Sequence, residues 1–127
     1  MKTYAPTSPG RRQLIGLDYR RALTTAEPFK PLTGGRKRAV GRSNAGRISV
    51  RHKGGGHKRL YRLVDFKYDK IDVPGRVETI EYDPNRSGFI GLVLYRDGAR
   101  RYILLPKTLN VGDEVLTSAT APLTVGN

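Results

Sequence analysis

Between Glu27 and Asp65 the sequence contains not one carboxylate, and this gap limits what the chain can fold into. Residues 1–62 hold 16 lysines and arginines against two acidic residues, whereas residues 63–127 hold eight against nine. A basic, glycine-containing segment with little apolar periodicity cannot bury enough surface to build a core of its own. The sequence therefore predicts a basic arm over residues 1–59 joined to a nearly neutral body over residues 60–120.

The excess of positive charge indicates the kind of partner. A formal net charge of +13 and an isoelectric point near 10.5 favour a polyanion. The chain of 127 residues has room for one ordinary domain, and it contains no cysteine for disulfides or thiolate metal sites. The longest apolar run, at 89–95, is too short to cross a bilayer, and the N-terminus lacks the apolar core of a signal peptide. Nothing in the sequence indicates secretion.

From residue 60 onward the sequence pattern is typical of short β-strands separated by turns. The turn signals are Pro74-Gly75, the stretch DPNRSG at 83–88, and Asp97-Gly98, which is typical of a tight hairpin. The expected strands are 60–66, 76–82, 89–95, 100–106 and 113–118. Five short strands in about 60 residues predict a mainly β fold, a small five-stranded barrel of the oligonucleotide-binding (OB) type. Its expected core is Val64, Phe66, Ile80, Leu92, Val93, Leu94, Ile103, Leu105 and Val115.

Two glycine-rich stretches resemble nucleotide-binding motifs, but neither has all the residues that its motif requires. GRSNAGRI at 41–48 has the glycine spacing of a P-loop, but Arg47 and Ile48 stand where lysine and Ser/Thr are required. GGGHKR at 54–59 lacks the third glycine of a dinucleotide site and leads into a strand instead of a helix.

The histidines of the arm lack the partners that metal binding or catalysis needs. His52 and His57 supply two donors where a site needs three or four, and their neighbouring lysines repel a cation. Ser49 lies near His52 in sequence, but the basic arm offers no acid to complete a triad.

The carboxylates of the body fit a general acid–base pair no better. On a strand, Glu78 and Glu81 would project to opposite faces, where they form a solvated barrel surface or pair with Arg100 and Arg101. We therefore expect no enzyme, no cofactor and no metal.

A nucleic acid explains the basic arm better than a solvated charge run or a nuclear-import signal at 35–42. Arginine forks match phosphate oxygens, and glycines let the backbone approach a phosphate and thread between RNA helices. Histidine and Tyr61 can stack on unpaired bases. The glycines also deny the arm an amphipathic membrane helix. Because no element is built for the DNA major groove, RNA is favoured over DNA.

Several stretches resemble one known family in order and spacing. They are PTSPGRRQ (6–13), RHKGGGHK (51–58), YDPNRS (82–87) and RRYILLP (100–106), together with the surrounding residues. The combination closely resembles the N-terminal half of the bacterial-type ribosomal protein two family of the large subunit. Leu105 departs from a common alanine, and RALTTAE (21–27) lies where the family varies in length.

The resemblance implies a primary binder of large-subunit ribosomal RNA that supports translation and subunit association. It implies an OB barrel carrying a long arm, usually followed by an SH3-like domain that holds a histidine-rich loop. Residues 121–127 would then begin a linker to that second domain, which is absent from this sequence. A fragment, a split gene and a truncated chain all remain open. No catalytic role discussed for that second half carries over.

The candidate RNA-binding residues are the cations of the arm, the glycines and histidines between them, and one arginine of the DPNRS turn. They are Arg11, Arg12, Arg36, Lys37, Arg38, Arg42, Arg47, Arg51, His52, Lys53, Gly54, Gly55, Gly56, His57, Lys58, Arg59, Arg62 and Arg86. For Arg86 a purely structural role in the turn is an equal alternative.

The expected partners are large-subunit ribosomal RNA and other ribosomal proteins, with no membrane, no small-molecule substrate and no homo-oligomer. The expected location is the ribosome of a bacterial cytoplasm, with an organelle matrix as the second choice. The competing class is a free-standing single-strand-binding or chaperone-like protein with the same barrel. Which RNA helices are contacted, and whether the arm is ordered without RNA, stay open.

Overall fold

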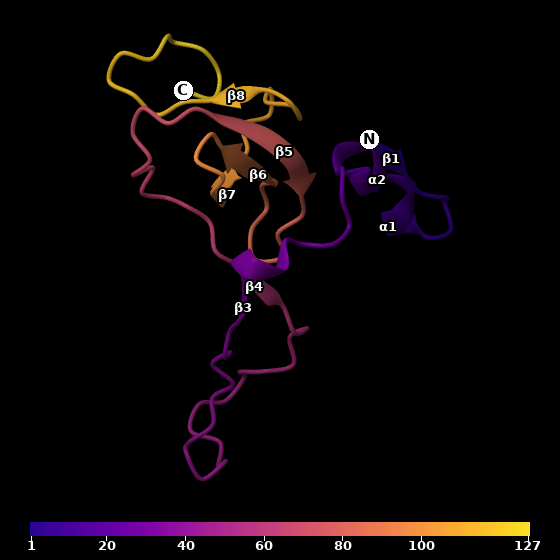
Figure 1. Ribbon diagram of the computed structural model, residues 1–127. Coiled ribbons are helices and arrows are strands. Elements are labelled where there is room, and N and C mark those ends of the chain that lie inside the picture. Colours follow the sequence, from indigo (N-terminus) through magenta and orange to yellow (C-terminus); the bar gives the residue numbers. More distant parts are fainter.

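The computed structural model describes all residues from 1 to 127 and is mainly β (Figure 1). Its centre is a curled, antiparallel four-stranded sheet in the order β7-β6-β5-β8. The four strands are β5 (Gly75–Glu81), β6 (Ile90–Tyr95), β7 (Arg100–Leu104) and β8 (Glu114–Val115). Each lies inside or within one residue of an expected strand, so these four predictions are confirmed.

The expected hairpin joins β6 to β7. Gly98 has a φ of 81°, a conformation that glycine adopts without a steric cost. The Tyr95 N–H donates to the Ala99 carbonyl at 2.9 Å and closes the turn. On the other side of β6, the register with β5 shifts between Val77 and Thr79, which marks a β-bulge. A bulge bends its strand and increases the local twist, which suits a curled sheet.

Two apolar clusters form the core. The larger contains Val77, Val93, Tyr95, Ile103, Leu109 and Val115, and the smaller contains Ile90, Leu92 and Tyr102. Of the predicted core, Leu92, Val93, Ile103 and Val115 are buried, and Val64, Ile80, Leu94 and Leu105 are partly buried.

Phe66 is the one predicted core residue that the structure contradicts. Its side chain is 55% exposed, because β4 (Leu60–Arg62) ends four residues earlier and Phe66 belongs to no strand. Its ring lies 5.4 Å from the guanidinium carbon of Arg86, a cation–π contact at the surface.

The expected first strand of the barrel is also different in the structure. β4 pairs with β3 (Thr33–Gly35) in a separate two-stranded ladder, not with the four-stranded sheet. Val64, just after β4, makes a single parallel bridge to Tyr102 of β7. The sheet is therefore a half-barrel of four strands, and the prediction that 60–66 adds a fifth strand to it is wrong. β3 has the sequence TGG, which carries no strand signal.

The first 22 residues form a small unit, not an extended arm. β1 (Lys2–Thr3) pairs with β2 (Ile15–Gly16), and α1 (Pro9–Arg12) lies between them. α2 (Tyr19–Ala22) completes the unit, which stands to one side of the sheet in Figure 1. We call residues 1–22 the N-terminal unit. It separates Arg11 and Arg12 from the other predicted RNA-binding residues.

Residues 36–59 run out from β3 and return to β4 (Figure 1). We call them the basic loop. The free arm expected from the sequence is thus a loop held at both ends. We call these two ends its roots: the first is residues 29–35, which contain the short 3-10 helix η1 (Lys30–Leu32) and β3, and the second is β4. No helix has the length and apolar character that crossing a membrane would require. The division into an arm of 1–59 and a body of 60–120 stays a prediction.

Candidate nucleic-acid interface

The two ends of the basic loop are tied together at the sheet. β3 and β4 pair in antiparallel register, with Thr33 opposite Arg62 and Gly35 opposite Leu60. The Leu63 N–H also donates to the Leu32 carbonyl at 2.9 Å, which extends the ladder past the strands. The 24 residues between the roots therefore begin and end at one hydrogen-bonded ladder.

One buried hydroxyl fastens the first root to the sheet. The Tyr102 hydroxyl accepts a hydrogen bond from the Phe29 N–H at 2.7 Å and donates to Glu81 Oε2 at 2.6 Å. Thr79 Oγ1 donates to the other oxygen of Glu81 at 3.0 Å. Burial, and then the bond to Glu81, raise the pKa of the Tyr102 hydroxyl well above its usual range. The hydroxyl therefore keeps its proton and remains a donor.

The DPNRS turn fastens the second root. Asp83 is fully buried, and its Oδ1 accepts from the Asn85 N–H and Nδ2, each at 2.9 Å. Asn85 Nδ2 also donates to the Leu60 carbonyl at 3.0 Å, so the turn touches β4 directly. Arg86 Nε donates to Asp83 Oδ2 at 2.5 Å. Arg86 thus has a structural role in the turn, and its contact with RNA stays a prediction.

The far end of the basic loop is a small closed turn. Arg42 and Ile48 form an antiparallel bridge, and the Ser49 N–H donates to the Gly41 carbonyl at 2.8 Å. Gly41 has a φ of 65°, and a side chain there would collide with the Val50 carbonyl. Only glycine fits at this position. Arg47, Ile48 and Arg51 are all exposed on and beside this turn.

The three consecutive glycines lie on the returning limb of the loop. Gly54 and Gly55 have φ values of 111° and 71°, and open space surrounds the position of each missing side chain. Their backbone is consequently accessible, as close approach to a phosphate requires. Gly56 instead packs against the Arg38 guanidinium, which donates from Nη1 to the His57 carbonyl at 2.9 Å. His52 also adopts a positive φ of 59°.

Ion pairs are distributed as unevenly as the charges. None of the 11 lysines and arginines between residues 30 and 62 makes an ion pair. In the body, by contrast, Lys70, Arg86, Arg100 and Arg101 are all paired with carboxylates. The basic loop therefore keeps its whole positive charge for an external partner.

The pairing in the body confirms one expectation and corrects another. Arg100 holds both oxygens of Glu78, at 2.7 and 2.9 Å, and this guanidinium lowers the pKa of Glu78. Arg101 pairs with Asp65 and Asp69, not with Glu81 as we expected. Glu81 is buried and bound to Tyr102, so it is neither a surface residue nor an acid–base candidate.

A hollow brings part of the predicted set together where the loop meets the DPNRS turn. Arg36, Lys37, Arg38, Gly56, His57, Arg59 and Asn85 line it. Lys37 and Arg59 also line an adjoining hollow together with Lys58. The cations of both limbs thus surround one concave surface. Arg42, Arg47, Arg51, His52 and Lys53 lie farther out toward the tip, whereas Arg11 and Arg12 lie in the N-terminal unit.

Arg62 differs from the other candidate residues, because it is only 8% exposed. Its Nη1 donates to the Leu60 carbonyl at 2.6 Å, and its Nε has no hydrogen-bond partner. A buried guanidinium in β4 cannot reach a phosphate without leaving its position. Arg62 therefore belongs to the root of the loop in this structure, and its contact with RNA stays a prediction.

Comparison with known proteins gives a consistent result over the whole chain. Residues 29–117 match the model of the family described as Ribosomal Proteins L2, RNA binding N-terminal domain. The chain belongs to the ribosomal protein L2 family. Over all 127 residues it is 57% identical to large ribosomal subunit protein uL2 of Hyphomonas neptunium, and 54% identical to that of Rhodopseudomonas palustris. It covers 46% and 45% of those two proteins, slightly less than half their length.

Membership in the L2 family confirms the resemblance drawn from the sequence motifs. The family is one of ribosomal structural proteins, which agrees with the expectation that the chain is not an enzyme. The matched region begins at Phe29, where the first root is bonded to Tyr102, and includes the basic loop and all four strands of the sheet.

Residues that sequence reasoning missed are mainly those that position the loop. Tyr102, Glu81 and Asn85 carry no charge pattern that distinguishes them from ordinary strand and turn residues. Lys2, Tyr4, Tyr19 and Arg20 of the N-terminal unit were missed as well. The alternation of aromatic and basic residues in KTY and DYRR is the signal that could have drawn attention to them.

Proposed function

We propose that this chain is a structural constituent of the large ribosomal subunit that binds large-subunit ribosomal RNA through the basic loop. In that role it supports translation and subunit association, beside other ribosomal proteins and in the bacterial cytoplasm. The observation that carries the proposal is the contrast in pairing. The cations of residues 36–59 make no ion pair within the chain, whereas four of the eight lysines and arginines of residues 63–127 are paired with carboxylates. A chain that leaves so much charge uncompensated on one projecting segment needs a polyanion there.

The loop would bind mainly by neutralising phosphates, a mode that positions the protein without reading base sequence. The proposed phosphate contacts are Arg36, Lys37, Arg38, Arg42, Arg47, Arg51, Lys53, Lys58 and Arg59. Gly54 and Gly55 would let backbone N–H groups approach the RNA, and His52 and His57 would add contacts to phosphate or base. Arg11 and Arg12 would contact RNA separately, from the N-terminal unit.

The body would hold the two ends of the basic loop in place. The bond at Tyr102 fixes the first root to β7, and the bond from Asn85 fixes β4, the second root, to the DPNRS turn, so the loop enters the RNA in one direction. We further propose that the curled four-stranded sheet is the OB-type half-barrel of the family. In this view residues 60–120 form the barrel domain, and residues 121–127 lead toward a second domain.

Sedimentation through a high-salt cushion tests the proposal against the competing single-strand-binding or chaperone-like role. Large subunits lacking their own L2 would be reconstituted with this chain and centrifuged. A ribosomal constituent stays in the pellet with the particle, whereas a loosely bound chaperone remains in the supernatant. Recovery of the chain only in the supernatant would overturn the proposal.

A further inference from the structure

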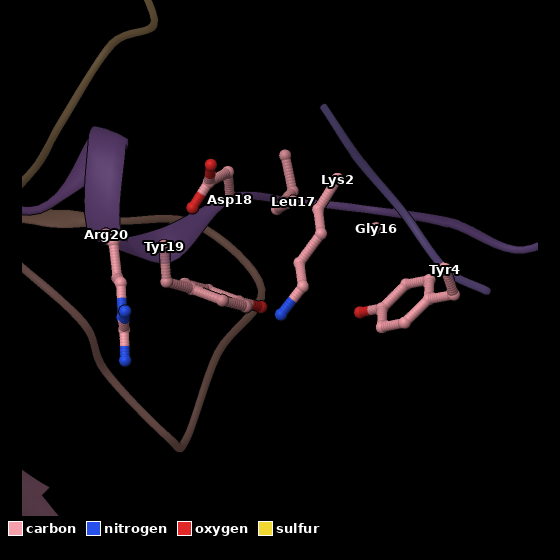
Figure 2. Close-up of a pocket in the computed structure, with 7 residues that line it drawn as sticks. All are labelled: Lys2, Tyr4, Gly16, Leu17, Asp18, Tyr19 and Arg20. Carbon is pink, nitrogen blue, oxygen red and sulfur yellow. The ribbon is translucent and has the colours of Figure 1, made fainter.

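The N-terminal unit contains a hollow that the basic loop does not touch. Residues of the β1–β2 ladder, in which Lys2 pairs with Gly16, form one wall of the hollow. The first residues of α2 form the other wall. In Figure 2 the side chains of Lys2, Tyr4 and Tyr19 extend into this hollow from two different segments. Their polar ends are an ammonium and two phenolic hydroxyls, which are all hydrogen-bond donors.

The Tyr4 ring forms part of the wall of the hollow, and its packing on Gly16 fixes the shape of the hollow. A side-chain carbon at Gly16 would come within 2.8 Å of the Tyr4 hydroxyl, so any other residue would push the ring away. Lys2 Nζ lies 5.4 Å from the centre of the Tyr4 ring, and the Arg11 guanidinium carbon lies 5.7 Å from it. Cation–π contacts of this kind hold Lys2 beside Tyr4.

The hollow is also fixed relative to the sheet. The Tyr19 ring meets the rings of Tyr82 and Phe89 edge to face, at centroid distances of 5.3 and 6.0 Å. Farther along, the Thr24 N–H donates to the Ile80 carbonyl at 3.1 Å, and the Ile80 N–H donates to Thr24 Oγ1 at 2.8 Å. The N-terminal unit is thereby attached to the outer edge of β5.

The charges around the hollow favour an anion. Lys2 and Arg20 line it, and neither makes an ion pair within the chain. Asp18 is the one acid in the lining, and it lies 3.4 Å from Arg21 Nε, which offsets its charge. An ammonium and two hydroxyls that converge on one space match the oxygens of a phosphate group.

We propose that this hollow binds one backbone phosphate of the RNA, held by Lys2 and by the hydroxyls of Tyr4 and Tyr19. The inference rests on the proposed function, since the RNA supplies the phosphate. It adds one phosphate contact to those proposed for Arg11 and Arg12 on the N-terminal unit, which stands beside the sheet, away from the basic loop (Figure 1). Two contacts on one rigid body bind with greater avidity than either does alone, because the second engagement becomes intramolecular.

The test compares Tyr4→Phe/Tyr19→Phe with wild type for binding to large-subunit ribosomal RNA. The double variant keeps both rings and all their packing, and it removes only the two donors. We expect affinity to fall about tenfold with an unchanged salt slope, since hydrogen bonds are lost and no charge is. Lys2→Gln should instead reduce the magnitude of the slope by about 0.7 to 0.9 units, as the loss of one phosphate contact predicts. Tyr82→Phe is the matched control, because that hydroxyl lies outside the lining and should not affect binding.

Ethylation interference on the RNA locates the phosphate. In wild type, ethylated phosphates that weaken binding should fall into two groups, one for the loop and one for the N-terminal unit with its hollow. In Tyr4→Phe/Tyr19→Phe one position should stop interfering while the loop positions remain. An identical interference pattern and unchanged affinity in the variant, with wild type still bound to the RNA, would overturn this inference alone. Absence of RNA binding by wild type would overturn the proposed function as well.

Discussion

Replacing Tyr102 with phenylalanine removes one hydroxyl from the point where the basic loop joins the sheet. That hydroxyl accepts from the Phe29 N–H at 2.7 Å and donates to Glu81 Oε2 at 2.6 Å. Tyr102 has no exposed surface and Glu81 is 4% exposed, so water cannot take the place of the lost hydroxyl beside Glu81. The variant therefore leaves a carboxylate oxygen and a backbone N–H without their partners.

The magnitude follows from these two bonds. A hydrogen bond to a charged group contributes about 1.5–3 kcal/mol, and an orphaned backbone donor costs about 1 kcal/mol more where water is excluded. Phe29 is partly exposed, so its N–H recovers part of that loss from solvent. We expect Tyr102→Phe to lower the free energy of unfolding by about 2–3 kcal/mol. Urea unfolding followed by circular dichroism measures it.

A double-mutant cycle with Glu81→Gln shows whether the loss arises at this contact. The two residues touch, so the cycle should give a coupling energy of about 1 kcal/mol or more. Tyr82→Phe is the matched control, because its side chain is 44% exposed and its hydroxyl makes no hydrogen bond within the chain. A loss below about 0.5 kcal/mol for Tyr102→Phe, or strictly additive changes with Glu81→Gln, would refute the reasoning.

Three further predictions concern glycines and alkaline pH. Gly41→Ala should open the turn at the tip of the loop, because the new methyl group collides with the Val50 carbonyl, and faster amide exchange in that turn measures the opening. Gly46→Ala is the control, since Gly46 has a similar φ of 77° but open space around it, and it should have a smaller effect. Equal effects of the two variants would contradict the steric argument. Gly75→Ala should cost about 1–3 kcal/mol in urea unfolding, because its methyl carbon would lie 2.5 Å from Val93 Cγ1 in the core; an unchanged midpoint would show that the core yields there. Because burial raises the pKa of Tyr102 in the folded chain, while an unfolded tyrosine ionises near pH 10, stability should fall as pH rises above about 10. Tyr102→Phe should show a shallower loss over that range, and an identical pH profile would contradict the assignment.

The strands of the sheet could be predicted because their signals are local. Apolar alternation, the Asp97-Gly98 turn and the DPNRS turn all lie within or beside the elements that they define. The partner of β4 could not be predicted, because β3 is a TGG segment more than 20 residues away that has no strand propensity. The ladder forms there because the loop must be closed at its base. Phe66 was misplaced for the same reason, since the strand was expected to continue to it.

The interface was predictable as far as charge determines it. The absence of acids between Glu27 and Asp65 predicted a basic arm over residues 1–59, and the structure leaves the cations of residues 36–59 without ion pairs. The sequence did not indicate that Arg62 is buried, because burial depends on its strand register opposite Thr33. Nor did it separate residues 1–22 from the loop, since a fold of such short strands and helices has no periodicity to read.

The salt dependence of RNA binding tests the central claim most directly, namely that unpaired loop cations hold the chain on its RNA. If about eight phosphates are contacted, the slope of log K against log salt concentration should be about −6 for wild type. Arg51→Ala/Lys58→Ala should flatten it by about one to two units. Lys70→Ala/Arg100→Ala removes the same charge from paired residues of the body, so it should leave the slope close to that of wild type. An unchanged slope in the loop variant, or equal flattening in both, would contradict the account.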